Sequence, residues 1–343
     1  MEFIGIDLHT NRFTCSYRDE HTPPNAKKGK RTETFELTDR GLAAFYQTLT
    51  PDTYVLIEAT ITTFSFVRLI QHAVKEVIVA NTYELKQISL ARINTDKIDA
   101  NILSRMLKMF VLGGEQAVFA VTVPPVPIQE LRGLFSTYRL YRKQTRRKMI
   151  RSIETDTVMS FQIQELFDLL ETMEGRIELL KDKIMEESKP YMGEIAILTS
   201  MKGMSVFIAI AIIADIITVD RFKDSKSFTS YLRSAPRVSS SNTSVKNRGT
   251  NKMGRKLAAT LLSQSLNHVL AASPKLNRWY LRLTEYKKPG SVRTALRRRV
   301  FAEIYQMLKK GEYHYGREAE KHEAKLAQYR KFLEKREVFL KSA

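Results

Sequence analysis

The feature that most constrains the fold is the mostly apolar run at residues 2–9, EFIGIDLH. Such a run suits a central strand that is covered on both faces. Asp7 lies near the carboxyl end of this strand, and Gly5 permits another backbone to approach closely. The run therefore predicts a buried strand at the centre of a sheet, with an acidic side chain at the edge of that sheet.

The segments that follow predict a mixed sheet. Residues 12–18 alternate in polarity and residues 32–38 form a third candidate strand. Helices and strands then alternate, with helices at 39–49 and 63–75, strands at 53–58 and 76–81, and helical sequence to about residue 110. Three antiparallel strands followed by alternating helices and strands predict an α/β domain with the element order of the ribonuclease H-like fold.

Four carboxylates are candidates for one metal site. Asp7 and Glu58 would end neighbouring central strands, and open sheets place their sites outside the carboxyl ends of such strands. Asp96 and Asp99 lie three positions apart at the expected start of a helix, with Thr95 as the N-cap, so they share a face. Acids in a first turn are also common without any metal. Four converging acids repel one another unless cations hold them, and two Mg²⁺ ions about 4 Å apart, or Mn²⁺ in their place, would do so.

The charge balance points to a polyanionic partner. The 343 residues carry 56 lysines and arginines against 37 acidic residues, a net charge of +19, which favours nucleic acid over a membrane surface. The single cysteine, Cys15, excludes an intrachain disulfide and a cysteine-rich zinc site, which favours the cytoplasm. No secretory signal is expected, and the most apolar stretch, residues 204–214, is too short for a membrane span.

Long helices are expected after the prolines at 124, 125 and 127. The first of them is strongly basic, and its candidate nucleic-acid contacts are Arg139, Arg142, Lys143, Arg146 and Arg147. The next has apolar positions from Leu166 to Ile184 that step by four and three, which is a heptad seam. The seam predicts an interaction arm that pairs two subunits, with an antiparallel hairpin inside the chain as the alternative.

Two further segments carry candidate phosphate contacts. Two helical pieces meet at residues 202–205, where Lys202 and a glycine turn resemble a helix-hairpin-helix element, although glycine is also a simple helix stop. Residues 234–256 are small, hydroxylic and basic, which predicts a loop, with disorder as the alternative. A serine in this loop would be a candidate nucleophile among several cations. Those cations are Arg237, Lys246, Arg248, Lys252 and Arg255.

With these pieces in order, the chain resembles the insertion sequence 110 transposases, the DEDD recombinases that also include the Piv-type DNA invertases. The resemblance covers roughly residues 1–285. It rests on FIGIDLHT, VLIEAT, INTDKIDANILSRML, MKGMSVFIAIAIIADI with RFKDSKSFTSYL, and APRVSSSNTSVKNRG. It implies a RuvC-like domain whose four acids are Asp7, Glu58, Asp96 and Asp99.

The family also carries a serine in the pattern proline-arginine-three residues-serine-glycine. Pro236 and Arg237 place that serine at Ser241, with Asn242 where glycine is usual. Three other serines crowd the position, namely Ser239, Ser240 and Ser244. The resemblance implies metal-assisted strand cleavage by the serine, a phosphoserine link to DNA, and rejoining without ATP.

The resemblance further implies the partners and the organisation of the chain. The partners are the DNA of the element ends and target, a noncoding (bridge) RNA as guide, and further copies of the chain in a dimer or tetramer, near the nucleoid of a prokaryotic cell. Four parts are expected: a RuvC-like catalytic domain at 1–123, a helical coiled-coil arm at 124–193, a serine-bearing and mostly helical transposase domain at 194–290, and a basic helical extension at 291–343.

Three rival functions use the same features differently. A hydrolytic nuclease of the Holliday-junction type would use the four acids with water as nucleophile, which leaves the serine-rich segment without a role. An actin-like sugar kinase would need a second glycine-rich phosphate segment, which the sequence lacks. A non-catalytic nucleic-acid-binding scaffold derived from a transposase would not need to retain the acids.

Overall fold

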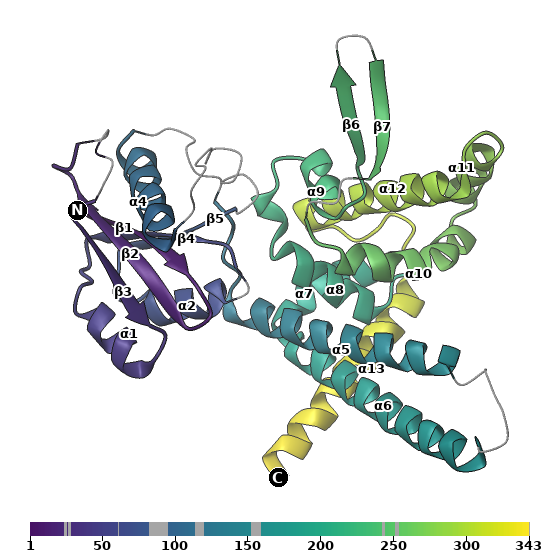
Figure 1. The fold of residues 1–343 in the computed structure, drawn as a ribbon. Helices are drawn as coiled ribbons and strands as arrows, with labels where there is room; N and C mark the ends of the chain where they lie inside the picture. The colour runs from purple at the N-terminus through teal and green to yellow at the C-terminus, as the bar shows by residue number, and fades with distance from the viewer. Residues whose placement is uncertain are drawn as a thin grey trace. The chain divides into compact units, whose positions relative to one another are not determined.

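The structure, a computed structural model, describes residues 1–23, 26, 29–60, 62–81, 95–113, 120–151, 159–241, 244–250 and 254–342 (Figure 1). For residues 144–151, 159–167, 236–250 and 337–342 it describes the backbone only. The chain divides into two compact units, residues 1–123 and 124–343. Each unit has its own apolar core.

The first unit is built on a five-stranded mixed sheet in the order β3-β2-β1-β4-β5. The central strand β1 pairs antiparallel with β2 and parallel with β4, so that Ile6 lies between Cys15 and Ile57. The strands are β1 (Glu2–Leu8), β2 (Arg12–Asp19), β3 (Arg31–Glu36), β4 (Thr53–Glu58) and β5 (Glu76–Ala80). The predicted strands are therefore confirmed.

Helices cover both faces of this sheet. One face carries an aromatic cluster in which Phe13 contacts Phe45 of α1 (Asp39–Tyr46) and Phe66 of α2 (Thr63–Ile70). The other face packs against α4 (Asp96–Gly113). Successive side chains of β1 point to opposite faces of the sheet, so the strand contributes apolar side chains to the cores on both faces.

Gly5 decides how closely α4 approaches the sheet. A Cβ atom at this position would lie 2.2 Å from the backbone nitrogen of Ser104 and 2.3 Å from the carbonyl oxygen of Ala100. The helix backbone thus rests directly on β1, as the sequence predicted. This contact fixes the height of α4 above the strand that carries Asp7.

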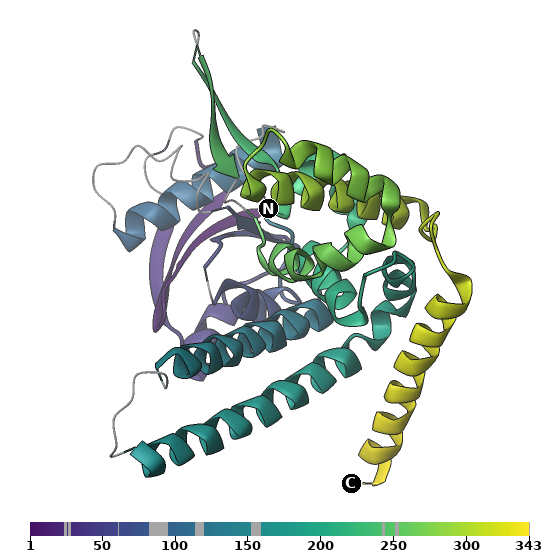
Figure 2. The same ribbon diagram turned by 90° about the vertical axis from the view of Figure 1, so that its right-hand side faces the viewer.

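The second unit is mainly helical, and α8 (Val206–Ile216) lies at its centre with a run of buried residues from Ile208 to Ile216. Helices α5 (Val126–Arg151) and α6 (Met159–Glu187) lie side by side (Figure 2). The heptad positions Ile177 and Ile184 of α6 are buried in the core of this unit. The remaining helices are α7 (Met192–Thr199), α9 (Ser225–Tyr231), α10 (Leu257–Ala272), α11 (Pro274–Thr284), α12 (Pro289–Lys310) and α13 (Ala319–Ser342).

The prediction of a loop for residues 234–256 is wrong. Its described part forms the two-stranded antiparallel sheet of β6 (Pro236–Ser241) and β7 (Ser244–Thr250), which extends away from the helices of its unit (Figure 1). The absence of apolar side chains suggested a loop, but strands can pair through backbone hydrogen bonds whatever side chains they carry. Together, the mixed sheet and the helical second unit confirm the predicted α/β plus α class.

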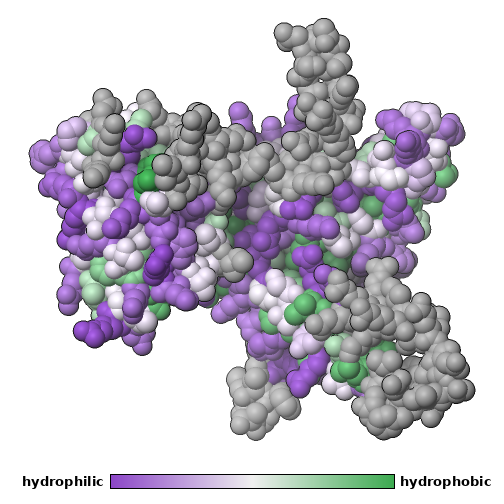
Figure 3. All heavy atoms as spheres, in the orientation of Figure 1, coloured by the Kyte–Doolittle hydropathy of each residue, from purple (hydrophilic) through white to green (hydrophobic). Residues whose placement is uncertain are grey.

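Side chains on the visible face of both units are mostly hydrophilic, with small scattered hydrophobic patches (Figure 3). No helix among the described residues is long and apolar enough to cross a membrane.

Candidate metal centre

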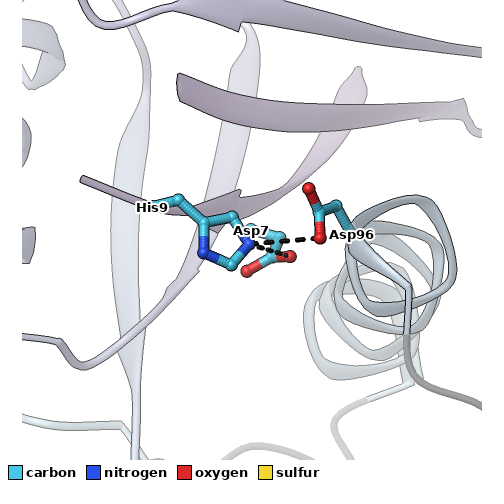
Figure 4. Close-up of side chains that lie close together, drawn as sticks. All are labelled: Asp7, His9 and Asp96. Atoms are coloured by element: carbon cyan, nitrogen blue, oxygen red, sulfur yellow. Dashed lines mark hydrogen bonds and ion pairs between the residues drawn. The ribbon is translucent and has the colours of Figure 1, made fainter. Parts of the chain in front are cut away.

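Asp7, His9 and Asp96 form a compact group at the carboxyl end of β1. The Nε2 atom of His9 lies 3.1 Å from Oδ2 of Asp7 and 3.3 Å from Oδ1 of Asp96, so that one ring nitrogen contacts both carboxylates (Figure 4). One ligand atom from each of the three residues lies within 4.8 Å of the others. The group thus joins the central strand to the first turn of α4.

Local structure explains why these side chains meet. Asp7 and His9 are two positions apart in extended chain, so both project to the same side. Asp96 begins α4, and the predicted cap is confirmed because the N–H of Ile98 donates to Oγ1 of Thr95 over 3.4 Å. The contact of α4 with Gly5 holds this first turn near the end of β1.

The pKa values of the acids reflect opposing effects of burial and charge. Burial raises the pKa of Asp7, the negative charges of Asp99 and Asp96 add to the rise, and His9 opposes it. Burial also raises the pKa of Asp99, again with a contribution from Asp96. For Asp96, burial acts upward, but His9 and Arg12 outweigh it and hold its pKa below the usual range.

The other two predicted acids lie outside this three-residue group. Asp99 is near enough that its charge affects Asp7, and it lies one turn beyond Asp96 on α4. Glu58 ends β4, the parallel neighbour of β1, and its carbonyl oxygen accepts a hydrogen bond from Oγ1 of Thr63 over 2.7 Å. The described structure therefore brings Asp7 and Asp96 together, with Asp99 beside them and Glu58 at the end of the adjacent strand.

Sequence reasoning missed two basic side chains that contact the acids, His9 and Arg12. His9 follows Asp7 by two residues, a spacing that in a strand already indicates a shared face. Arg12 begins β2 and donates from Nη2 to Oδ2 of Asp96 over 2.9 Å. Antiparallel pairing places Arg12 opposite the end of β1, and the N–H of His9 donates to the carbonyl oxygen of Arg12 over 2.9 Å.

The donor set fits a divalent cation. Carboxylate oxygens are the ligands that Mg²⁺ and Mn²⁺ prefer, and imidazole is also compatible with Mn²⁺ and other transition metals. Burial raises the pKa values of Asp7 and Asp99, so it disfavours their ionised forms, and a bound cation would oppose this effect. His9 and Arg12 supply part of that compensation from the protein itself.

The candidate nucleophile lies in the second unit. Ser241 ends β6, and its Cα partner across the hairpin is Ser244 at the start of β7. The side chains of both strands lie outside the described part of the structure. They include the candidate site residues Arg237, Ser239, Ser240, Ser241, Ser244, Lys246 and Arg248. Lys252 lies wholly outside the described residues, as do the side chains of Arg146 and Arg147.

The described basic residues have different surroundings. Arg139, Arg142 and Lys143 are exposed on α5. Lys202 forms an ion pair with Glu318. Arg255, just after the β hairpin, donates from Nε to Oδ1 of Asp215 over 2.8 Å.

Packing explains the glycine turn between α7 and α8. Gly203 has a φ of +82°, which favours glycine, and a Cβ atom there would lie 2.8 Å from the backbone nitrogen of Val269. The turn is therefore held against the backbone of α10. Ser205 then caps α8 by accepting a hydrogen bond from the N–H of Ile208.

Fold and site together define an α/β plus α protein with an acidic, cation-compatible centre at the carboxyl end of a central strand. Residues 195–281 match the family model described as Transposase IS116/IS110/IS902 family. This match, from α7 to α11, supports the predicted resemblance to the IS110-family transposases. No curated protein matches the chain.

Proposed function

We propose that this DNA transposase cuts and rejoins DNA with the acids of its first unit as a divalent-cation site and Ser241 as the nucleophile. The observation that carries the proposal is the convergence of Asp7 and Asp96 at the end of the central strand. The strand order β3-β2-β1-β4-β5 supports a RuvC-like assignment of this unit. The family match supports DNA as the substrate, and it includes the hairpin that carries Ser241.

The residues that would hold the cation are Asp7 and Asp96, with Asp99 and Glu58 beside them. A bound divalent cation would supply Lewis-acid polarisation of the phosphodiester. His9 and Arg12 position the carboxylates through the contacts already described. They also keep Asp96 ionised, since they lower its pKa.

Ser241 performs the covalent step in this proposal. Its Oγ forms a bond to the phosphorus atom and loses its proton, while the bond between phosphorus and a sugar oxygen breaks and that oxygen takes up a proton. The phosphoserine ester retains the energy of the phosphodiester. Attack by a DNA hydroxyl on this ester rejoins the strands and restores the serine without ATP.

A noncoding guide RNA and an oligomer belong to the same proposal. The exposed cations of α5, Arg139, Arg142 and Lys143, support a nucleic-acid contact there. Purification with and without ribonuclease tests the RNA. Sequence-directed recombination that persists in RNA-free protein contradicts RNA guidance, and mass measurement in solution tests the dimer or tetramer.

The decisive experiment compares Ser241→Ala with Asp7→Asn in a strand-cleavage and rejoining assay. The proposal expects both variants to lose recombination by at least a hundredfold, while Ser244→Ala, a matched control on the same hairpin, retains it. A covalent protein–DNA product should form with the unaltered chain and be absent with Ser241→Ala.

A junction nuclease gives a different result in the same assay. Ser241→Ala would then cut DNA normally in a metal-dependent manner, and no covalent product would appear with any variant. Retained cleavage by Ser241→Ala therefore overturns the serine assignment. A chain that binds DNA but never cuts it would instead support the scaffold.

A further inference from the structure

Arg18 on β2 is a buried arginine whose hydrogen bonds are incomplete. Its side chain is 2% exposed. Nε donates to Oγ of Ser104 over 3.0 Å and Nη2 donates to the carbonyl oxygen of Ala26 over 3.1 Å. Among the described residues, Nη1 has no partner. A buried charged nitrogen without an acceptor is costly, so these residues compensate the charge of Arg18 only in part.

A second arginine adds to this unbalanced charge. Burial lowers the pKa of Arg18, and the positive charge of the exposed Arg105 on α4 lowers it further. Both arginines line two cavities of about 260 and 360 Å³ on the same flank of α4. Lys97 also lines the larger cavity, and none of the lining residues is acidic.

The surrounding framework is fixed by hydrogen bonds. Lys108 donates to the carbonyl oxygens of Asp19, Glu20 and Thr22 over 2.8, 2.7 and 2.6 Å, so its charge caps a turn. The side-chain oxygen of Asn101 accepts from the N–H of Gly29 over 2.7 Å. Arg18, Arg105 and Lys97 thus remain as cations without an acidic partner among the residues that line the cavities.

We propose that Arg18, Arg105 and Lys97 hold one backbone phosphate of a bound nucleic acid on this flank of α4. Arginine suits this role because its planar donors match phosphate oxygens. The exposed Arg105 and Lys97 would donate to the phosphate, and the buried Arg18 beneath them would contribute its positive charge.

Position along α4 relates this phosphate to the acidic centre. Nine residues separate Asp96 from Arg105, which is about 14 Å of helix at 1.5 Å per residue. A strand that meets the acidic centre could therefore also reach Arg105 within a few nucleotides. The inference rests on nucleic-acid binding by the proposed transposase but needs no cleavage.

Binding is measured with the full chain carrying Asp7→Asn, in EDTA, so that no strand is cut. Fluorescence anisotropy of a labelled 30-base-pair DNA and of a labelled single-stranded RNA is followed across salt concentrations. Arg105→Gln and Lys97→Gln are compared with Arg40→Gln, an exposed arginine on α1 with the same change of charge. These variants avoid the buried Arg18, whose replacement could unfold the chain.

We expect Arg105→Gln to weaken binding about tenfold and to reduce the salt slope by about one, because one phosphate contact is lost. Lys97→Gln should act in the same direction, while Arg40→Gln should leave the slope unchanged. A loss with DNA alone, with RNA alone, or with both supports the site and identifies the strand that it holds. Equal effects of Arg105→Gln and Arg40→Gln overturn the site, whereas failure of the parent chain to bind either probe contradicts the proposed function itself.

Discussion

Arg12 donates a hydrogen bond from Nη2 to Oδ2 of Asp96 over 2.9 Å, although 84 positions separate the two residues in the chain. The contact joins the start of β2 to the first turn of α4. His9 approaches the other oxygen of the same carboxylate at 3.3 Å. Two basic side chains therefore meet at the acid that was predicted to bind metal, and a divalent cation would compete with them.

Replacing Arg12 should strengthen cation binding. Arg12→Gln removes a positive charge close to the site, and a unit charge repels a divalent cation about 4 Å away in water by about 2 kcal/mol. The Mn²⁺ or Mg²⁺ concentration at which the metal-induced rise in Tm reaches half of its maximum should therefore fall by up to about thirtyfold. Arg40→Gln is the control and should leave it unchanged. An unchanged midpoint in Arg12→Gln would show that the ion does not use Asp96.

Replacing Asp7 should stabilise the metal-free protein near neutral pH. The pKa of Asp7 is raised in the folded protein relative to about 3.9 in the unfolded chain. The carboxyl group therefore stabilises the fold fully only below about pH 3.9, and this stabilisation is lost as the pH rises through the pKa of the folded protein. Asp7→Asn removes this loss, so its Tm at pH 7 in EDTA should exceed that of the unaltered chain by about 2 °C. The difference should shrink as the pH falls toward 4.

Excess Mg²⁺ or Mn²⁺ should reverse this order. A ligand that binds only the folded state stabilises it, and Asp7→Asn loses a ligand atom. Thermal melts from pH 4.5 to 8, with EDTA or with excess metal, measure both effects. A metal-induced rise in Tm that is equal in both proteins would exclude Asp7 as a ligand.

Gly5→Ala should displace α4, which carries Asp96, from the sheet. The added methyl group would meet the backbone of α4 at Ser104 and Ala100, and such overpacking costs about 1–3 kcal/mol. Because α4 carries Asp96, stabilisation by metal should decline as well. Gly133→Ala on α5 is the control, since nothing lies within 4 Å of its Cβ, and it should stabilise by up to about 1 kcal/mol. A melt of Gly5→Ala identical to that of the unaltered chain would contradict the close packing.

Asp215→Ala should destabilise the second unit. Asp215 is fully buried, and it accepts hydrogen bonds from Nε of Arg255 and from the N–H of Ala258, each over 2.8 Å. Loss of one partner of a buried ion pair costs about 3 kcal/mol. Chemical denaturation measures this change in the free energy of unfolding.

Asp220→Ala is the matched control for that measurement. Asp220 pairs with Lys309, but its side chain is 73% exposed, so the change should be under about 1 kcal/mol. If both variants unfold at the same denaturant concentration, the contacts of Asp215 with Arg255 and Ala258 do not stabilise the second unit.

Part of the fold was predictable because its signals are local. Apolar runs and alternation predicted all five strands of the sheet, and the close approach at Gly5 followed from a glycine in a buried strand. Residues 236–250 were not predictable in the same way, since their pairing depends on backbone hydrogen bonds and their side chains resemble those of a loop. The glycine turn at 202–205 was correctly placed, but its contact with α10 could not be inferred from neighbouring residues.

The sequence alone determined the class of fold and indicated a transposase, and it nominated Asp7, Glu58, Asp96 and Asp99 as acids at element ends. Tertiary structure alone decided that His9 and Arg12 contact the carboxylate of Asp96, and that Arg18 is buried without a full set of acceptors among the described residues. The physical reason is distance along the chain. Strand and helix patterns depend on neighbouring residues. The ion pair of Arg12 and Asp96 forms only when segments some 80 positions apart pack together.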